Sequence, residues 1–126
     1  MERYVDGFVL SVPNDKIDAY RQMAEEAGTL WIEHGALAYF EGVGDDVNPD
    51  VDGMAVRTFP ELAGAGDDES VVFAFVTYES REHRDEVNAK VMNDPAMNPD
   101  RPGEEMPFDP ERMAYGGFRS IVSHER

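Results

Sequence analysis

Hydrophobic and polar residues alternate along four separate stretches of the chain, a pattern that predicts β-strands because successive strand side chains point to opposite faces. These stretches cover residues 4–12, 36–43, 70–78 and 113–122. The third is almost continuously apolar, which is typical of a central strand buried on both faces. A sheet of four strands is therefore expected.

A first helix is predicted between the first two strands, because apolar residues recur at helical spacing from Ile17 to Trp31. Asn14 is the expected N-cap, since its side chain can accept a hydrogen bond from the first turn. Gly35, which follows His34, is the natural stop.

A second helix is predicted from Ser80, as its cap, to about Met92, where Asn93-Asp94-Pro95 ends it. Residues 54–59 are expected to form a short strand or an extended arm. The proline-rich stretch at 95–110 predicts an ordered excursion or loop.

The resulting order of elements is strand, helix, strand, linking excursion, strand, helix, strand. This order is typical of the ferredoxin-like βαββαβ arrangement, an α+β fold with an antiparallel sheet. With 126 residues, the chain is predicted to form a single domain over 1–126.

Two helices cover only one face of such a sheet, so the other face needs an explanation. We assign Tyr4, Phe8, Leu10, Phe73 and Phe75 to that uncovered face, which is then too apolar to remain in water. Pairing two sheets face to face predicts a homodimer with a two-sheet barrel. The alternative is a monomer whose excursions fold over the face.

Composition limits the kind of protein. The chain has no cysteine, which excludes disulfides and thiolate chemistry. No apolar run approaches the roughly 18 residues of a membrane span, and the amino terminus is acidic where a signal peptide is basic. We therefore expect a cytoplasmic protein that does not enter a membrane.

The charge is strongly negative, with 27 acidic and 11 basic residues and a net charge of −16. Lys16 and Lys90 are the only lysines, and this acidic, lysine-poor composition resembles that of halophilic proteins, which work in molar salt. An ordinary acidic protein is the alternative. Nucleic-acid binding is disfavoured, because it depends on basic groups that displace counterions.

Few residues are candidates for chemistry. Asp6 and Glu41 are the catalytic candidates, because two carboxylates on the face assigned to the barrel can act as an acid and base pair. Tyr39, Tyr115 and Arg119 are candidates for binding an anionic or phenolic substrate. The alternative for the two carboxylates is a hydrogen-bonded structural role or a strand end in water, and for the other three residues it is a place in the core or interface.

His34 is a further candidate for substrate binding, although a position at the negative end of a helix also explains it. The three histidines are too far apart in the sequence to suggest a metal site, and no metal or cofactor is predicted.

Several motifs resemble the YbaA-like family of uncharacterised bacterial and archaeal proteins. They are Tyr4-Val5-Asp6-Gly7-Phe8, Gly35-Ala36-Leu37, Val71-Val72-Phe73, Asn93-Asp94-Pro95-Ala96-Met97, Met106-Pro107-Phe108-Asp109 and Arg112-Met113-Ala114-Tyr115-Gly116-Gly117-Phe118. The resemblance implies the dimeric α+β barrel fold, whose superfamily includes cofactor-independent monooxygenases, haem-degrading enzymes, chlorite-dismutase relatives and small isomerases. It implies no established activity.

Three functions remain open. The chain is expected to be a small-molecule enzyme of the cofactor-independent oxygenase or isomerase kind, a non-catalytic ligand-binding protein, or a structural, stress-associated homodimer. The first two require a cavity of a few hundred cubic ångströms, and the third predicts a barrel filled with side chains.

Overall fold

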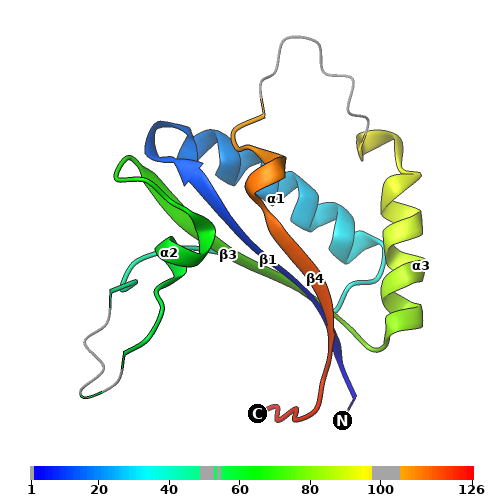
Figure 1. Ribbon diagram of the computed structural model, residues 1–126. Coiled ribbons are helices and arrows are strands. Elements are labelled where there is room, and N and C mark those ends of the chain that lie inside the picture. The colour runs from blue at the N-terminus through cyan, green and yellow to red at the C-terminus, as the bar shows by residue number, and fades with distance from the viewer. Residues whose placement is uncertain (1, 49–52, 54, 98–105) are drawn as a thin grey trace.

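The computed structural model describes residues 2–48, 53, 55–97 and 106–126. Its antiparallel sheet has the strand order β2-β3-β1-β4 (Figure 1). The strands are β1 (Tyr4–Pro13), β2 (Ala38–Val43), β3 (Glu69–Tyr78) and β4 (Ala114–Arg119). All four predicted strands are confirmed, and β3 is central as its apolar sequence indicates.

Two long helices, α1 (Ile17–Glu33) and α3 (Arg81–Met92), lie on the same face of the sheet (Figure 1). A short helix, α2 (Phe59–Ala63), contacts β1 and β3. The protein is thus an α+β fold with one four-stranded antiparallel sheet and three α-helices.

The core lies between the sheet and the two long helices. Leu10 and Val12 of β1 pack with Tyr20 and Ala24 of α1 and with Val72 of β3. A second cluster joins the sheet to α3, and its buried members are Ala36, Val76, Tyr78, Val87 and Val91. These contacts fix which side chains face the helices.

The predicted uncovered face was partly wrong. Leu10 lies opposite Val72 in the β1–β3 register, so alternate residues of β1 from Tyr4 to Val12 face the helices. Tyr4, Phe8 and Leu10 therefore belong to the helix-covered face. The prediction combined positions that the strand register places on opposite faces.

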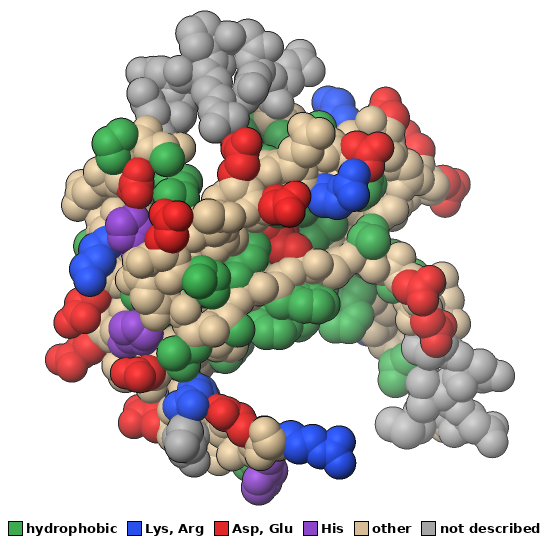
Figure 2. Space-filling model, turned by 180° about the vertical axis from the view of Figure 1, so that it is seen from behind, with side chains coloured by type: hydrophobic (Ala, Val, Ile, Leu, Met, Phe, Trp, Pro, Cys, Tyr) green, Lys and Arg blue, Asp and Glu red, His purple; other side chains and the backbone are tan. Residues whose placement is uncertain are grey.

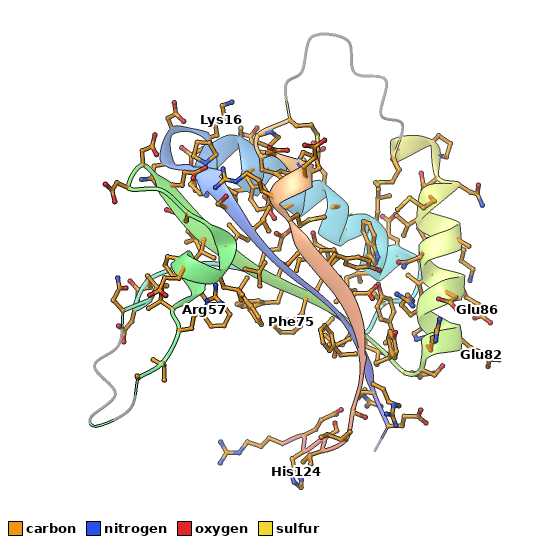
Figure 3. The ribbon with its side chains drawn as sticks, viewed as in Figure 1. Lys16, Arg57, Phe75, Glu82, Glu86 and His124 are labelled. Carbon is orange, nitrogen blue, oxygen red and sulfur yellow. The ribbon has the colours of Figure 1, made fainter. Side chains whose placement is uncertain are left out.

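Phe73 and Phe75 do belong to the face that α1 and α3 leave uncovered, hereafter the open face. Figure 3 shows Phe75 pointing away from both long helices. Hydrophobic side chains gather in a hollow on this side of the molecule (Figure 2). Phe73 is 45% exposed, so β3 is not buried on both faces within one chain.

Two local predictions were wrong. Asn14 makes no capping hydrogen bond to α1, because a 3₁₀ turn at Asn14–Lys16 precedes the helix and the Asn14 amide oxygen accepts from Ser70 Oγ at 2.5 Å. Of the short strand or extended arm predicted at 54–59, residue 54 lies outside the described residues, 55–58 form no strand, and Phe59 begins α2. Thr58 caps α2 by accepting from the backbone N–H of Glu61 at 3.2 Å.

The boundaries of the long helices agree with the sequence. Ser80 Oγ accepts from the backbone N–H of His83 at 3.1 Å and caps α3, which ends at Met92. Gly35, with φ of 114°, follows the end of α1. Within the predicted 95–110 excursion, residues 98–105 lie outside the described residues.

None of the helices in the described part of the chain has the length and apolar character needed to cross a membrane.

Candidate functional site

A cavity of about 690 Å³ lies between α1 and the helix-covered face of the sheet. Its walls come from α1, all four strands or their ends, and the segments that flank 98–105. Its lining includes Phe8, Tyr20, Ala27, Trp31, Tyr39, Glu41, Met97 and Phe108. The volume falls within the roughly 300–1,000 Å³ of small-molecule sites.

Glu41 supplies the main polar group of this cavity. Tyr39 and Glu41 are two residues apart on β2, so both side chains point to the helix-covered face. Tyr39 donates its hydroxyl hydrogen to Glu41 Oε2 at 2.5 Å, and Tyr20 of α1 donates to Oε1. The two tyrosines therefore hold both carboxylate oxygens in place.

The two hydroxyl groups stay protonated well beyond neutral pH. Burial, followed by the hydrogen bond to Glu41, raises the pKa of Tyr20 far above its usual range. The same two causes raise the pKa of Tyr39. Both tyrosines are therefore donors, and Glu41 is the acceptor between them.

Trp31 forms an aromatic wall of the same cavity, next to Tyr39. Its ring centroid lies 6.2 Å from that of Tyr39, with the planes tilted by 38°. Trp31 Nε1 donates to Asn88 Oδ1 at 3.1 Å, and the Tyr78 hydroxyl donates to the same oxygen at 3.3 Å. Asn88 thus fixes the indole ring against α3.

Asp6 lies in a different cluster from Glu41. Both carboxylates face the helices and not the uncovered barrel face that the sequence predicted for them. Asp6 does not line the cavity, and its Oδ1 accepts from Arg84 Nη1 at 2.8 Å. Arg84 also donates to the Tyr115 hydroxyl at 3.2 Å and to the Tyr4 hydroxyl at 3.4 Å. The predicted convergence of Asp6 with Glu41 is replaced by an ion pair with α3.

Tyr115 and Arg119 also lie outside the cavity. Tyr115 stacks on Phe8 with 4.8 Å between ring centroids, and burial followed by the charge of Asp6 raises its pKa. Arg119, at the end of β4, is exposed and lies opposite Tyr4 in the register. Of the predicted substrate-binding residues, Tyr39 is the one that lines the cavity.

His34 lies at the C-cap of α1, as the sequence predicts, but its ring contacts another element. Nε2 lies 2.8 Å from Oδ2 of Asp94, which follows α3. A hydrogen bond from the Ala96 backbone N–H, followed by the one from His34, lowers the pKa of Asp94. This contact fixes the chain just before Met97 reaches the cavity wall.

Tyr20, Trp31 and Arg84 were not among the site residues predicted from the sequence. Tyr20 and Trp31 follow the apolar period of α1, so their polar atoms carried no separate signal. Arg84 is one of several charged residues on α3, and nothing in the sequence distinguishes it. Its partner Asp6, a charged residue within an apolar strand, was the available sign that a cation lies opposite.

Metal-ligating side chains do not cluster within the described residues: no group of three or more His, Asp or Glu there could hold a metal ion.

Similarity to known proteins shows the family of this chain. The family described as "Protein of unknown function (DUF1428)" matches residues 3–110. The chain belongs to the DUF1428 family. "Uncharacterized protein YbaA" of Escherichia coli strain K12 is 49% identical to it over 120 residues, which cover 95% of this chain and 97% of the relative.

The proteins of the same name from Escherichia coli O157:H7 and Shigella flexneri give the same identity and coverage. The resemblance to YbaA-like proteins is thereby confirmed at the level of the DUF1428 family. Neither the family description nor the relatives' names state an activity. The cavity is therefore the main indication of function.

Proposed function

We propose that this DUF1428 protein binds a small, largely apolar molecule in the cavity beneath α1. One observation carries the proposal: two tyrosine hydroxyls hold the carboxylate of Glu41 inside a mainly apolar cavity of about 690 Å³. Apolar walls with a few convergent polar groups are the usual composition of ligand sites. A purely structural homodimer requires no such cavity.

We also propose that the fold is ferredoxin-like and that two copies form a dimeric α+β barrel. The strand order β2-β3-β1-β4 and the placement of α1 and α3 on one face support the ferredoxin-like assignment. The barrel would form when a second copy covers the open face.

The composition of the open face supports a homodimer. Phe40, Phe73 and Phe118 are 48%, 45% and 62% exposed on three different strands. From Val71 to Thr77, every open-face residue of β3 is uncharged. A two-fold axis would place this apolar face against its own copy, which buries both at once.

An enzyme is the second candidate function, and the environment of Glu41 favours it. A carboxylate in an apolar cavity can accept a proton from a bound molecule and return it at another position, as in an isomerase. However, both carboxylate oxygens of Glu41 already accept a hydrogen bond from a tyrosine, which occupies part of the site where a substrate proton would have to arrive. The geometry therefore supports binding more strongly than turnover, and this is why binding is the first proposal.

The amino-acid composition supports a proposal about the salt conditions and the compartment in which the protein works. We propose a cytoplasmic protein adapted to high salt, because a net charge of −16 with two lysines implies a surface that needs screening.

A thermal-shift screen tests the binding proposal. The purified protein in concentrated KCl is screened against neutral phenols, quinones, alcohols and other apolar metabolites, since a ligand specific for the native state raises its melting temperature. We expect a saturable rise for at least one compound. Ala27→Phe, which fills the cavity, abolishes the rise, whereas Ala89→Phe on the exposed side of α3 preserves it.

A flat screen, or a shift that Ala27→Phe leaves unchanged, contradicts the proposal. In that case the structural homodimer becomes the better explanation of the fold.

A further inference from the structure

The charge of the cavity indicates which ligands it can accept. Glu41 and Glu26 are the acidic residues among the described residues that line it, and this lining includes no Lys, Arg or His. An anionic ligand would therefore lose its hydration without gaining a counter-ion. This argues against the anionic substrates expected from the sequence.

The hydrogen bonds around Glu41 indicate what the ligand must supply. An ionised carboxylate accepts hydrogen bonds at about four lone-pair sites. Tyr20 and Tyr39 occupy one site on each oxygen, and both remain protonated because burial and Glu41 raise their pKa values. The remaining sites need further donors, and among the described residues that line the cavity none supplies a counter-ion to the carboxylate.

The aromatic walls provide the second favourable environment for positive charge. The ring centroids of Trp31 and Tyr39 lie 6.2 Å apart in the cavity that Glu41 also lines, and Tyr20 meets Phe108 edge-on at 5.7 Å. Aromatic faces attract cations, with tryptophan the strongest, and the attraction increases when the cation is desolvated. Methionines such as Met97 complete an adaptable apolar lining.

We propose that the ligand is a lipophilic cation: an amine whose ammonium group pairs with Glu41 while its apolar body contacts the aromatic and methionine walls. The inference rests on the proposed binding function and names the ligand class for that cavity. It assigns Glu41 the role of counter-ion, held in place by Tyr20 and Tyr39.

Three probes of matched size and different charge test this assignment: 3-phenylpropylamine, 3-phenylpropan-1-ol and 3-phenylpropanoate. Isothermal titration at pH 7 in 1 M KCl measures each affinity. We expect the amine to bind at least about tenfold more tightly than the alcohol, and the carboxylate not to bind. The preference follows from pairing in a site of low dielectric, where salt screens weakly.

Two variants separate a specific counter-ion from the general negative charge of the protein. Glu41→Gln keeps the size of the side chain and removes its charge, so the amine and the alcohol should then bind equally. Glu25→Gln removes one charge from an exposed position on α1 that does not line the cavity, and the preference for the amine should persist.

If Glu41→Gln fails to fold, Tyr39→Phe replaces it. That variant retains the carboxylate and should retain the order of affinities, with the amine still tightest.

Equal or weaker binding of the amine relative to the alcohol in the wild-type protein overturns the inference while the binding proposal stands. A preference for the amine that survives in Glu41→Gln also overturns it. Absence of binding by all three probes overturns it as well, and the screen of neutral compounds then decides separately whether the cavity binds any ligand.

Discussion

Arg84 and Asp6 form a buried ion pair that joins α3 to the sheet, with 2.8 Å between Nη1 and Oδ1. Their side chains are 13% and 3% exposed. The guanidinium also lies over the Tyr4 ring, 5.0 Å from its centroid. Burial opposes the charge of Arg84, but the combined effect of Asp6, Asp85, Tyr115 and Tyr4 outweighs it, and the pKa of Arg84 is raised. The pair therefore explains Asp6 as a structural residue of the core.

Replacement of Arg84 should be strongly destabilising. Arg84→Met leaves the Asp6 carboxylate buried without its partner, and we expect the free energy of unfolding to fall by about 3–5 kcal/mol. Urea denaturation monitored by circular dichroism measures the change. Arg81→Met, at an exposed position of the same helix, is the control and should change stability by less than about 0.5 kcal/mol.

The double variant Asp6→Asn with Arg84→Met tests whether the unpaired charge of Asp6 causes the loss of stability. It should recover part of the lost stability, because the buried charge is then gone. A double variant as unstable as the sum of the two single variants would contradict the pairing.

A second ion pair predicts a loss of stability in acid. Arg112 donates from Nη1 to Glu69 Oε2 at 2.8 Å, and this bond, followed by one from the Gly66 backbone, lowers the pKa of Glu69 to about 2. The lowered pKa means that Glu69 stabilises the fold fully above its unfolded value of 4.5 and loses this contribution as the pH falls towards 2.

Glu69→Gln should therefore be less stable than the wild type at pH 6, and the difference should shrink as the pH falls from about 4.5 towards 2. Urea denaturation at several pH values measures it. Glu61→Gln, at an exposed position of α2, is the control. A difference that stays constant with pH would show that Arg112 does not act through the charge of Glu69.

The strands and the two long helices can be predicted from the sequence because each has a local signal, whereas the short helix α2 was not predicted. Period-two alternation marks the strands, and Ser80 marks the start of α3. The residues of the open face were harder to predict. Alternation divides each strand into two sets of side chains, but it does not say which set of β1 shares a face with which set of β3. The register supplies that information through cross-strand pairs such as Leu10 and Val72.

The candidate site was predictable only in part for a similar reason. Tyr39 and Glu41 share a strand face, so their proximity follows from a spacing of two residues. Tyr20 comes from α1 and reaches Glu41 through packing between distant segments, which a local pattern does not encode. Asp6 was recognisable as unusual in an apolar strand, whereas its partner Arg84, 78 residues away, was not.

Gly28 of α1 should be needed for the position of Tyr39. A Cβ at residue 28 would lie 2.8 Å from Tyr39 Cδ1, so the ring has to move. Alanine normally stabilises a helix interior by about 1 kcal/mol relative to glycine, but overpacking costs about 1–3 kcal/mol. We expect Gly28→Ala to give no gain in stability and to displace Tyr39 from Glu41.

The chain has one tryptophan, Trp31, whose ring centroid lies 6.2 Å from that of Tyr39. Its fluorescence therefore reports a displacement of the Tyr39 ring. The emission of Gly28→Ala should shift, and that of Thr29→Ala, at the next and exposed position, should not. A more stable Gly28→Ala with unchanged emission would show that the helix and ring adjust without strain.

The proposed homodimer predicts a dependence on salt as well as on the open face. Two chains with a net charge of −16 each repel at low ionic strength, and the Debye length falls from about 10 Å at 0.1 M to about 3 Å at 1 M salt. Sedimentation equilibrium should therefore show tighter dimers at 1 M than at 0.1 M KCl. Apolar association between the open faces supplies the attraction.

Phe73→Glu places a carboxylate in the middle of that face and should give monomers at 1 M KCl, because the charge would be buried against its own copy. Ala89→Glu adds the same charge at an exposed position of α3 and should leave the dimer intact. A wild-type protein that sediments as a monomer at 1 M KCl contradicts the dimer. A Phe73→Glu variant that remains dimeric instead assigns the interface to another surface.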